Sequence, residues 1–201
     1  MELLLKHFPN LKPKQVKQFE LMISLYEEWN QKVNVISRKD TEHILEKHIL
    51  HSLALAKYKH FKNGSWTLDL GTGGGFPGLP LAIMFPKANF HLVDSIGKKI
   101  MVVNEIAETL GLKNVKVEKE RVENLEGSYH YIVSRAVAKT TQLLEWTKHL
   151  ALRNNTEYLF LKGGDLTEEL KPLGFKASIQ NISQYYKTEF YETKKIVWIK
   201  H

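Results

Sequence analysis

The chain contains no cysteine among its 201 residues. This absence excludes disulfide bonds, thiolate metal sites and cysteine nucleophiles, and it is typical of proteins in a reducing cytoplasm. Long apolar runs are also missing, so we expect no segment that crosses a bilayer. The first residues, Met1 to Lys6, lack the basic start and extended apolar stretch of a signal peptide. The sequence therefore predicts a cytoplasmic protein without a membrane partner.

The sequence also lacks the residue patterns of common acid–base and metal enzymes. No Ser-His-Asp arrangement and no catalytic pair of carboxylates stands out. His43, His48 and His51 lie close together, but no cysteine and few carboxylates accompany them. We therefore expect packing or substrate contact for these histidines, and no bound metal.

Negative charge is in the minority, with 22 acidic residues against 29 lysines and arginines. The resulting net charge of +7 and pI of about 9.3 favour a polyanionic partner such as nucleic acid, although many basic proteins bind none. With 43% hydrophobic and 25% charged residues, the composition is that of an ordinary globular protein. Nothing in the sequence specifies an oligomeric state, and a monomer is the favoured expectation.

Two regions differ in their predicted secondary structure. Residues 1–62 are predicted to form a helical N-terminal extension, because apolar residues recur there at helical spacing. The turn signal Asn63-Gly64 then precedes a domain over residues 63–201. In that domain strand-like and helix-like segments alternate, which indicates a mostly parallel sheet covered by helices. The expected strands are 66–70, 90–94, 115–118, 131–134 and 158–162, and the expected helices between them are 79–85, 99–110 and 139–150. Two final strands, 177–186 and 196–200, are expected to form an antiparallel hairpin joined by a short polar loop at the sheet edge.

A glycine cluster, Leu68-Asp-Leu-Gly-Thr-Gly-Gly-Gly-Phe-Pro-Gly78, connects the first predicted strand to the first helix of this domain. Glycines there allow a sharp turn and leave the backbone open to a ligand at the carboxyl end of the strand. The spacing of Gly71, Gly73 and Gly75 departs from the dinucleotide fingerprint, whose last position is taken by Phe76. A bulky Phe76 is expected to crowd a pyrophosphate, so a ligand without phosphate, such as S-adenosylmethionine (AdoMet), fits better. A plain turn without a ligand remains the alternative.

Two acidic residues accompany the glycine cluster. Asp94 ends the second predicted strand, at the distance from Gly71 where a carboxylate accepts hydrogen bonds from ribose hydroxyls in dinucleotide-binding folds. Its alternative role is to cap the following helix. Asp69 lies inside the first strand, where burial is costly unless the carboxylate is paired. We expect Asp69 to bond neighbouring loop groups and shape the glycine turn.

Cations gather at the predicted carboxyl edge of the sheet. Lys98 and Lys99 follow the second strand, Arg121 the third, Arg135 the fourth, and Lys162 ends the fifth. Lysines at a helix N-terminus are electrostatically disfavoured, which suggests another role for the first two. We expect at least two of these five residues to contact phosphate. Ordinary surface lysines are the alternative.

The residues described so far belong to a longer pattern that resembles the RsmG family, also called GidB. The pattern covers most of the chain and runs through Trp29-Asn30, Asn34, His48-Ile-Leu, Ser52-Leu53, the glycine cluster, Leu92-Val-Asp-Ser95, Gly97-Lys-Lys99, Arg121-Val-Glu123, Ser134-Arg-Ala136 and Leu161-Lys-Gly163. The chain departs from the family at His51, where the family usually carries Asp. This departure leaves the role of that helix open.

The resemblance implies a bacterial methyltransferase that uses AdoMet to modify guanine N7 in small-subunit ribosomal RNA, alone or in the subunit. It implies a Rossmann-like sheet of seven strands with a helical N-terminal extension. It also implies AdoMet contacts at Gly71, Phe76, Val122, Glu123 and Arg135, the last of which is the candidate for catalytic positioning. The candidate cofactor residues are then Gly71, Gly73, Gly75, Phe76, Asp94, Ser95, Val122, Glu123 and Arg135, and the RNA candidates are Lys98, Lys99, Arg121 and Lys162.

Methylation of guanine N7 is compatible with the absence of a catalytic acid–base pair in the sequence. Guanine N7 attacks through a lone pair and has no proton to lose, so in-line positioning of the base and the methyl group can supply most of the catalysis. Alternatives are a small-molecule AdoMet methyltransferase and a non-catalytic RNA-binding or ribosome-assembly protein. The basic edge argues against the former, and the glycine cluster with Asp94 argues against the latter. A nicotinamide dehydrogenase is disfavoured by Phe76.

Overall fold

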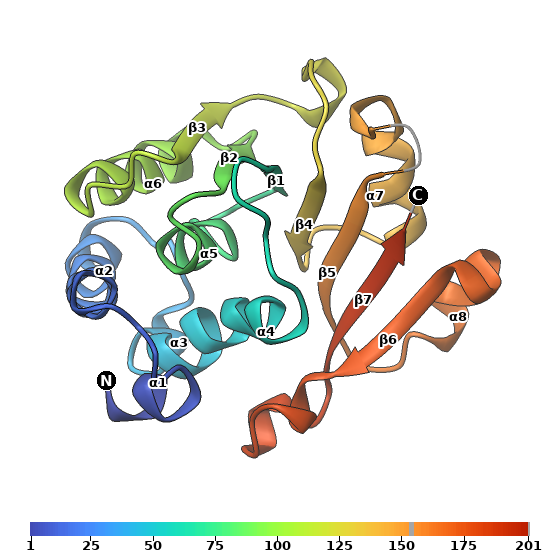
Figure 1. The fold of residues 1–201 in the computed structure, drawn as a ribbon. Coiled ribbons are helices and arrows are strands. Elements are labelled where there is room, and N and C mark those ends of the chain that lie inside the picture. The colour runs from blue at the N-terminus through green and yellow to red at the C-terminus, as the bar shows by residue number, and fades with distance from the viewer. Residues whose placement is uncertain (153–154, 201) are drawn as a thin grey trace.

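The computed structural model describes residues 1–152 and 155–200 (Figure 1). Seven strands form one sheet in the order β3-β2-β1-β4-β5-β7-β6. Their bounds are β1 Trp66–Leu70, β2 Asn89–Asp94, β3 Val115–Lys119, β4 Tyr131–Arg135, β5 Glu157–Gly163, β6 Ala177–Asn181 and β7 Lys194–Lys200. Strands β1 to β5 run parallel, whereas β7 pairs antiparallel with both β5 and β6. The predicted parallel sheet with a C-terminal antiparallel hairpin is confirmed.

The connection inside this hairpin differs from the prediction. Strand β6 ends at Asn181, and the chain then forms two 3-10 turns, η5 (Ile182–Gln184) and η6 (Glu189–Tyr191), before β7 begins. The connection is longer than the predicted polar loop because it carries buried anchors: Ile182, Tyr186 and Tyr191 are at most 1% exposed. The tyrosine rings pack against each other with centroids 4.8 Å apart. These apolar residues resemble a strand in the sequence but serve to hold a loop.

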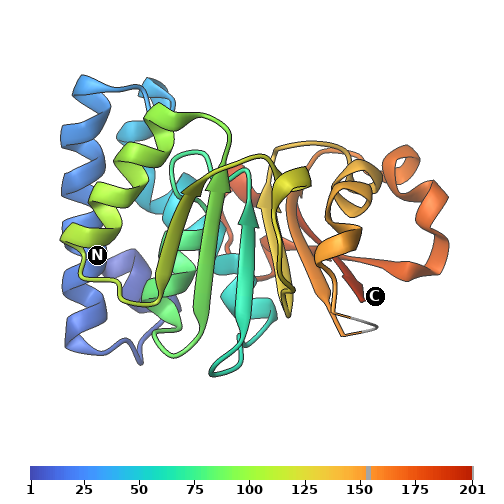
Figure 2. The same cartoon turned by 90° about the horizontal axis from the view of Figure 1, so that it is seen from above.

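Helices cover both faces of the sheet (Figures 1 and 2). The N-terminal region contains α1 Glu2–His7, α2 Pro13–Lys32, α3 Arg38–Thr41, the π-helical turn η1 Leu45–Leu50, and α4 His51–Tyr58. The remainder contains α5 Gly78–Met84, α6 Gly97–Thr109, η2 Val122–Asn124, α7 Thr140–Thr147, η3 Lys148–Leu150, α8 Thr167–Leu170 and η4 Lys171–Lys176. None of the helices in the described part of the chain is long and apolar enough to cross a membrane.

Each face of the sheet has its own hydrophobic cluster, because side chains alternate along buried parallel strands. On β2, Phe90 and Leu92 face the larger cluster with the N-terminal helices, α5 and α6. Val93, on the same strand, faces the smaller cluster, which includes Leu143 of α7 and Leu170 of α8. The central strands of the sheet are therefore buried between two helical layers, whereas the edge strands β3 and β6 are partly exposed.

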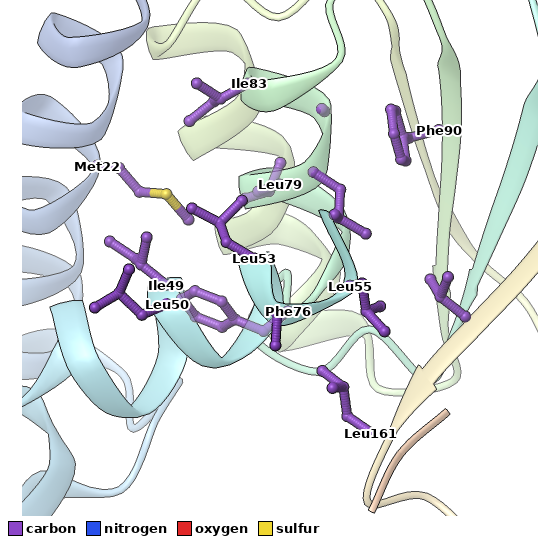
Figure 3. Packing of buried hydrophobic residues seen from close by; sticks show 14 of the residues in the cluster. Met22, Ile49, Leu50, Leu53, Leu55, Phe76, Leu79, Ile83, Phe90 and Leu161 are labelled. Atoms are coloured by element: carbon purple, nitrogen blue, oxygen red, sulfur yellow. The ribbon is translucent and has the colours of Figure 1, made fainter. Parts of the chain in front are cut away.

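The N-terminal helices share the larger cluster with the rest of the chain (Figure 3). Met22 of α2 and Leu53 of α4 lie beside Leu79 and Ile83 of α5, and all four are at most 1% exposed. Division into an extension over residues 1–62 and a domain over residues 63–201 stays a prediction. The shared cluster fixes α2 and α4 against the helix that follows the glycine cluster.

Candidate functional site

The glycine cluster forms a tight loop between β1 and α5, and a buried carboxylate holds it. Asp69 is fully buried, and its Oδ2 accepts hydrogen bonds from Thr72 Oγ1 at 2.6 Å and from Gly78 N at 2.8 Å. Burial raises the pKa of Asp69 to about 7, although these two hydrogen bonds oppose the shift. The expectation that Asp69 bonds neighbouring loop groups is confirmed.

This arrangement changes the reason for disfavouring a dinucleotide. The Phe76 ring does not crowd the N-terminus of α5 but lies in the core near Leu50 (Figure 3), where it is 1% exposed. It packs against the rings of Tyr26 and His48. Instead, the backbone N–H of Gly78 at the start of α5 already donates a hydrogen bond to the Asp69 carboxyl group. A phosphate at the same helix end would have to displace the Asp69 carboxyl from the Gly78 amide, so competition for that donor replaces the predicted steric argument.

A cleft of about 480 Å³ opens beside this loop at the carboxyl edge of the sheet. It is lined by ten of the residues predicted from the sequence, namely Gly71, Gly73, Phe76, Asp94, Ser95, Lys99, Arg121, Val122, Glu123 and Arg135. Its volume is in the range of sites that enclose a small organic ligand. The predicted residues Gly75, Lys98 and Lys162 lie outside its lining.

The three predicted glycines have different structural roles. Gly73 has φ +59°, and a Cβ added to it would have Gly71 O as its nearest neighbour, at 4.0 Å. The backbone of Gly73 is therefore open to the cleft. A Cβ on Gly71 would lie 2.6 Å from Val137 Cγ2, which shows how closely the loop after β4 approaches. A Cβ on Gly75 would collide with Leu79, so this glycine serves core packing instead.

Asp94 links the glycine loop to the start of α6. Its Oδ2 accepts from Gly73 N and its Oδ1 accepts from Ile96 N, both at 2.9 Å. Ile96 precedes α6, so this bond forms a turn before the helix and does not cap its first amides, and the capping role considered from the sequence is not observed. Each carboxylate oxygen keeps a second lone pair that can accept from a ligand hydroxyl. Ribose binding by Asp94 stays a prediction.

Arg135 ends β4 and projects into a group of neutral rings. Its Nη2 lies 3.0 Å from His48 Nδ1, and its guanidinium carbon lies 5.0 Å from the centroid of Phe76. Burial lowers the pKa of Arg135 to about 10, which leaves it cationic at neutral pH. Burial, with Arg135 nearby, lowers the pKa of His48 to about 4, so His48 is neutral and its Nδ1 accepts the hydrogen bond.

No carboxylate of the described residues forms an ion pair with Arg135. The alternative in which Arg135 pairs with an acidic residue at the sheet edge is therefore disfavoured. Arg135 is partly buried, and the carboxylates of Asp69 and Asp40 attract its charge without pairing with it. An anionic group in the cleft would add a direct partner and offset the cost of desolvation. The site thus presents a fixed positive charge beside the glycine loop.

With this geometry established, comparison with known proteins decides the family. Residues 15–197 match the family described as GidB, rRNA small subunit methyltransferase G. The chain belongs to this family. A protein named ribosomal RNA small subunit methyltransferase G from Flavobacterium psychrophilum is 51% identical over 99% of this chain and 97% of its own length. The protein of that name from Bacteroides fragilis is 47% identical over 99% of both chains.

Solved structures support the fold of this GidB-family chain. A SAM-dependent methyltransferase from Aquifex aeolicus superposes with a TM-score of 0.59 at 17% identity, covering 82% of this chain and 98% of its own. A precorrin-6y C5,15-methyltransferase from Geobacter metallireducens gives 0.57 at 9% identity, covering 76% and 87%. Both relatives transfer methyl groups by name, so the predicted methyltransferase fold is confirmed.

The cleft of this GidB-family chain fits AdoMet by its own chemistry. Gly73 leaves the backbone bare, Asp94 offers acceptors for a ribose, and Arg135 offers a cation for a carboxylate. Val122 and Glu123, on η2, line the side of the cleft beyond β2. AdoMet is the cofactor of the family, and these residues are the proposed contacts.

The predicted RNA contacts fall into two groups. Lys99 and Arg121 lie at the cleft, and Lys98 is exposed beside it at the start of α6. Lys162 is different, because its side chain is 9% exposed and forms an ion pair with Glu169 at 2.8 Å. It also donates to Ala138 O. Its charge is already neutralised, so we no longer place Lys162 among the RNA candidates.

Several residues of the site were not predicted from the sequence as site residues. Tyr26 of α2 donates its hydroxyl to Gly74 O of the glycine loop. Val35 and Ile36 line the cleft, and so does His48, for which the sequence predicts packing or substrate contact. They lie far from β1 in sequence, so no local pattern signals this contact. The helix-end motif Trp29-Asn30 was the nearest signal.

The neighbouring histidines differ in environment. His51 is 7% exposed, its Nε2 has no hydrogen-bond partner within the described structure, and its ring meets that of Phe190 edge-on at 5.6 Å. Burial holds the pKa of His51 well below its usual value. His43 lies exposed on the surface. In the described ranges, no three potential ligands gather around a metal position.

Proposed function

We propose that this chain transfers the methyl group of AdoMet to N7 of a guanine in small-subunit ribosomal RNA. The observation that carries this proposal is the cleft at the glycine loop, where Gly73, Asp94 and Arg135 come together in a chain that matches the family over nearly its whole length. Such a substrate would place the reaction in the bacterial cytoplasm, as the sequence predicts.

The residues of the cleft can position both reactants without acid–base chemistry. AdoMet supplies an electrophilic methyl group on its sulfonium. The N7 lone pair forms the new N–C bond as the S–C bond breaks, and no proton leaves the base. The chain's contribution is to hold N7, the methyl carbon and sulfur in line, which can correspond to effective molarities on the order of 10⁵ M or more.

The proposed division of the cleft follows the strand order. Asp94 and Ser95 at the end of β2, with Val122 and Glu123 beyond β3, would hold the nucleoside of AdoMet. Arg135, at the end of β4 on the other side of β1, would meet the amino-acid carboxylate. The target guanine must be unpaired or extruded to enter such a cleft.

The deciding experiment combines purified protein and labelled AdoMet with naked small-subunit ribosomal RNA or with assembled small subunits. Label at N7 of one guanine, mapped by cleavage at the modified base, is the expected result. Transfer to no RNA, with AdoMet binding intact in calorimetry, would contradict the proposal and favour a small-molecule substrate or a non-catalytic role. Separate reactions with the two substrates also show which assembly state is used.

A further inference from the structure

The segment between α2 and α3 forms one wall of the cleft. Val35 and Ile36 both line it, although they belong to the N-terminal region. A Cβ on Gly74 would lie 2.8 Å from Val35 Cγ1 and 3.1 Å from Val35 O. The wall therefore touches the glycine loop directly, and its position relative to that loop depends on backbone contact.

One buried side chain holds this wall in place. Asn30 lies in the last turn of α2, is 7% exposed, and accepts through Oδ1 from Val35 N at 2.9 Å and from Ile36 N at 3.1 Å. Its Nδ2 donates to Thr41 Oγ1 in α3 at 2.7 Å. A single amide thus joins the end of α2, the wall and α3, while Asn30 itself does not line the cleft.

The chemistry of the wall differs from that of the other sides of the cleft. Asp94 and Glu123 supply acceptors on one side of β1, and Arg135 supplies a cation on the other. Val35 and Ile36, which are 6% and 7% exposed, supply a small uncharged apolar surface beside the glycine loop. Such a surface suits the face of a purine ring, whereas it offers nothing to a phosphate or a carboxylate.

We infer that the wall formed by Val35 and Ile36 places the target base against the methyl group, and that Asn30 is a positioning residue of the reaction. This inference rests on the proposed function. Asn30 acts through the two backbone amides it holds. Loss of its Oδ1 frees the wall to move relative to the glycine loop, and a displacement of about 1 Å can slow a reaction on the order of 100-fold.

The test compares Asn30→Ala, which removes the clamp, with Asn30→Asp, which keeps the acceptor for both amides. Thr41→Val is the matched control, because it removes the bond to α3 and leaves the wall bonds intact. We would measure AdoMet affinity by calorimetry, single-turnover methyl transfer to ribosomal RNA or small subunits at saturating AdoMet, and thermal melting.

The expected result is that Asn30→Ala binds AdoMet with nearly wild-type affinity but transfers methyl groups about 10- to 100-fold more slowly. Asn30→Asp should restore most of the rate, and Thr41→Val should keep it. The inference is overturned if Asn30→Ala reacts at the wild-type rate, if its AdoMet affinity falls in step with the rate, or if Thr41→Val is equally slow.

If Asn30→Ala does not fold, Ile36→Ala decides the question, because it alters the wall surface and leaves the clamp intact. A slower transfer at unchanged AdoMet affinity supports the inference, and a wild-type rate overturns it. A wild-type protein that methylates no RNA contradicts the proposed function itself. An active wild type with an equally active variant contradicts the positioning role alone.

Discussion

Asp94 holds the glycine loop and also lines the cleft. Its two oxygens already accept from Gly73 N and Ile96 N, so the carboxylate orders the loop that it also presents to the cleft. We expect Asp94→Ala to weaken AdoMet binding by about 1.5–3 kcal/mol, the usual cost of a lost hydrogen bond to a charged group. Calorimetric titration of AdoMet measures this loss.

Asp94→Asn is the matched control, because it keeps one acceptor oxygen and removes the charge. An intermediate affinity is expected for that variant. Unchanged affinity in a folded Asp94→Ala protein would contradict the ribose role and leave Asp94 with the loop bonds alone.

Arg135 is partly buried and directly contacts the rings of His48 and Phe76, and no carboxylate of the described residues forms an ion pair with it. We expect Arg135→Ala to keep the fold and to lose methyl transfer by about tenfold for each 1.4 kcal/mol of lost positioning. Arg135→Lys should recover little, since an ammonium lacks the planar fork that meets both a ring face and a hydrogen-bond acceptor.

Single-turnover transfer and thermal melting, measured on the same samples, separate the two roles of Arg135. Near-normal transfer would contradict a functional role. Lost transfer accompanied by a collapsed melting temperature would show that Arg135 serves mainly the packing around Phe76.

His48 makes the site sensitive to acid. Burial lowers the pKa of His48 to about 4 in the folded protein, against about 6.5 in the unfolded chain, so the unfolded state binds more protons between these values. Stability from neutral His48 is therefore complete above about pH 6.5 and is lost as the pH falls towards 4, by up to about 3 kcal/mol. Asp69, whose pKa is raised to about 7, acts in the opposite direction over much of the same range.

Comparison of the wild type with His48→Gln isolates the contribution of His48 to the pH dependence of stability. Glutamine keeps a hydrogen-bond acceptor for Arg135 but does not titrate. Asp69 is present in both proteins, so its effect cancels. Urea unfolding at pH 5 and pH 7 should show that the wild type loses more stability than the variant on acidification. Equal losses in the two proteins would mean that His48 does not titrate in this way.

At the scale of elements, the hydroxyl of Tyr26 joins α2 to the glycine loop through Gly74 O. Tyr26→Phe keeps the ring contact with Phe76 and removes this hydrogen bond. We expect a loss of stability of about 0.5–1.5 kcal/mol, together with weaker AdoMet binding as the loop loses a support. Chemical unfolding and calorimetry measure the two effects, and wild-type values for both would show that α2 does not support the loop.

The strands could be predicted because their signals are local. The central parallel strands are short, mostly apolar runs, the edge strand β3 alternates valine with charged residues, and β1 begins and ends at the predicted residues 66 and 70. Residues 182–186, which include η5, were predicted as the end of a strand because Ile182 and Tyr186 are buried by distant partners, and an apolar residue in sequence does not show what buries it. The π-helical turn that presents His48 has no local signal either.

The candidate site likewise contains residues with a local sequence signal and residues that only long-range contacts bring into place. Residues on the strand ends and the glycine loop, such as Asp94 and Arg135, were predicted because the carboxyl ends of parallel strands must meet. Val35 and Asn30 come from a segment whose position is set by contacts across the core. The position of Lys162 in the sequence does not show whether its charge is available to RNA, because its ion-pair partner Glu169 is brought to it only by the fold.

For the whole molecule, the net charge of +7 predicts RNA binding that weakens steeply with salt, because phosphate contacts release counterions. Lys98→Ala/Lys99→Ala should lower the affinity and flatten the dependence of binding on salt. Lys14→Ala/Lys17→Ala is the matched control, since it removes the same charge from exposed positions on α2 outside the cleft lining. Binding measured over a range of salt concentrations tests the prediction, and identical slopes for the two double variants would contradict a specific role at the cleft.

The shared core of the N-terminal helices has a consequence for synthesis. The apolar faces of α2 and α4 are covered by Leu79 and Ile83, which leave the ribosome after them. Chains emerge N-terminus first, and an amphipathic helix gains most of its stability from packing. The first helices of this protein must therefore wait for α5, and the wall of the cleft takes its final place only when the glycine loop has been made.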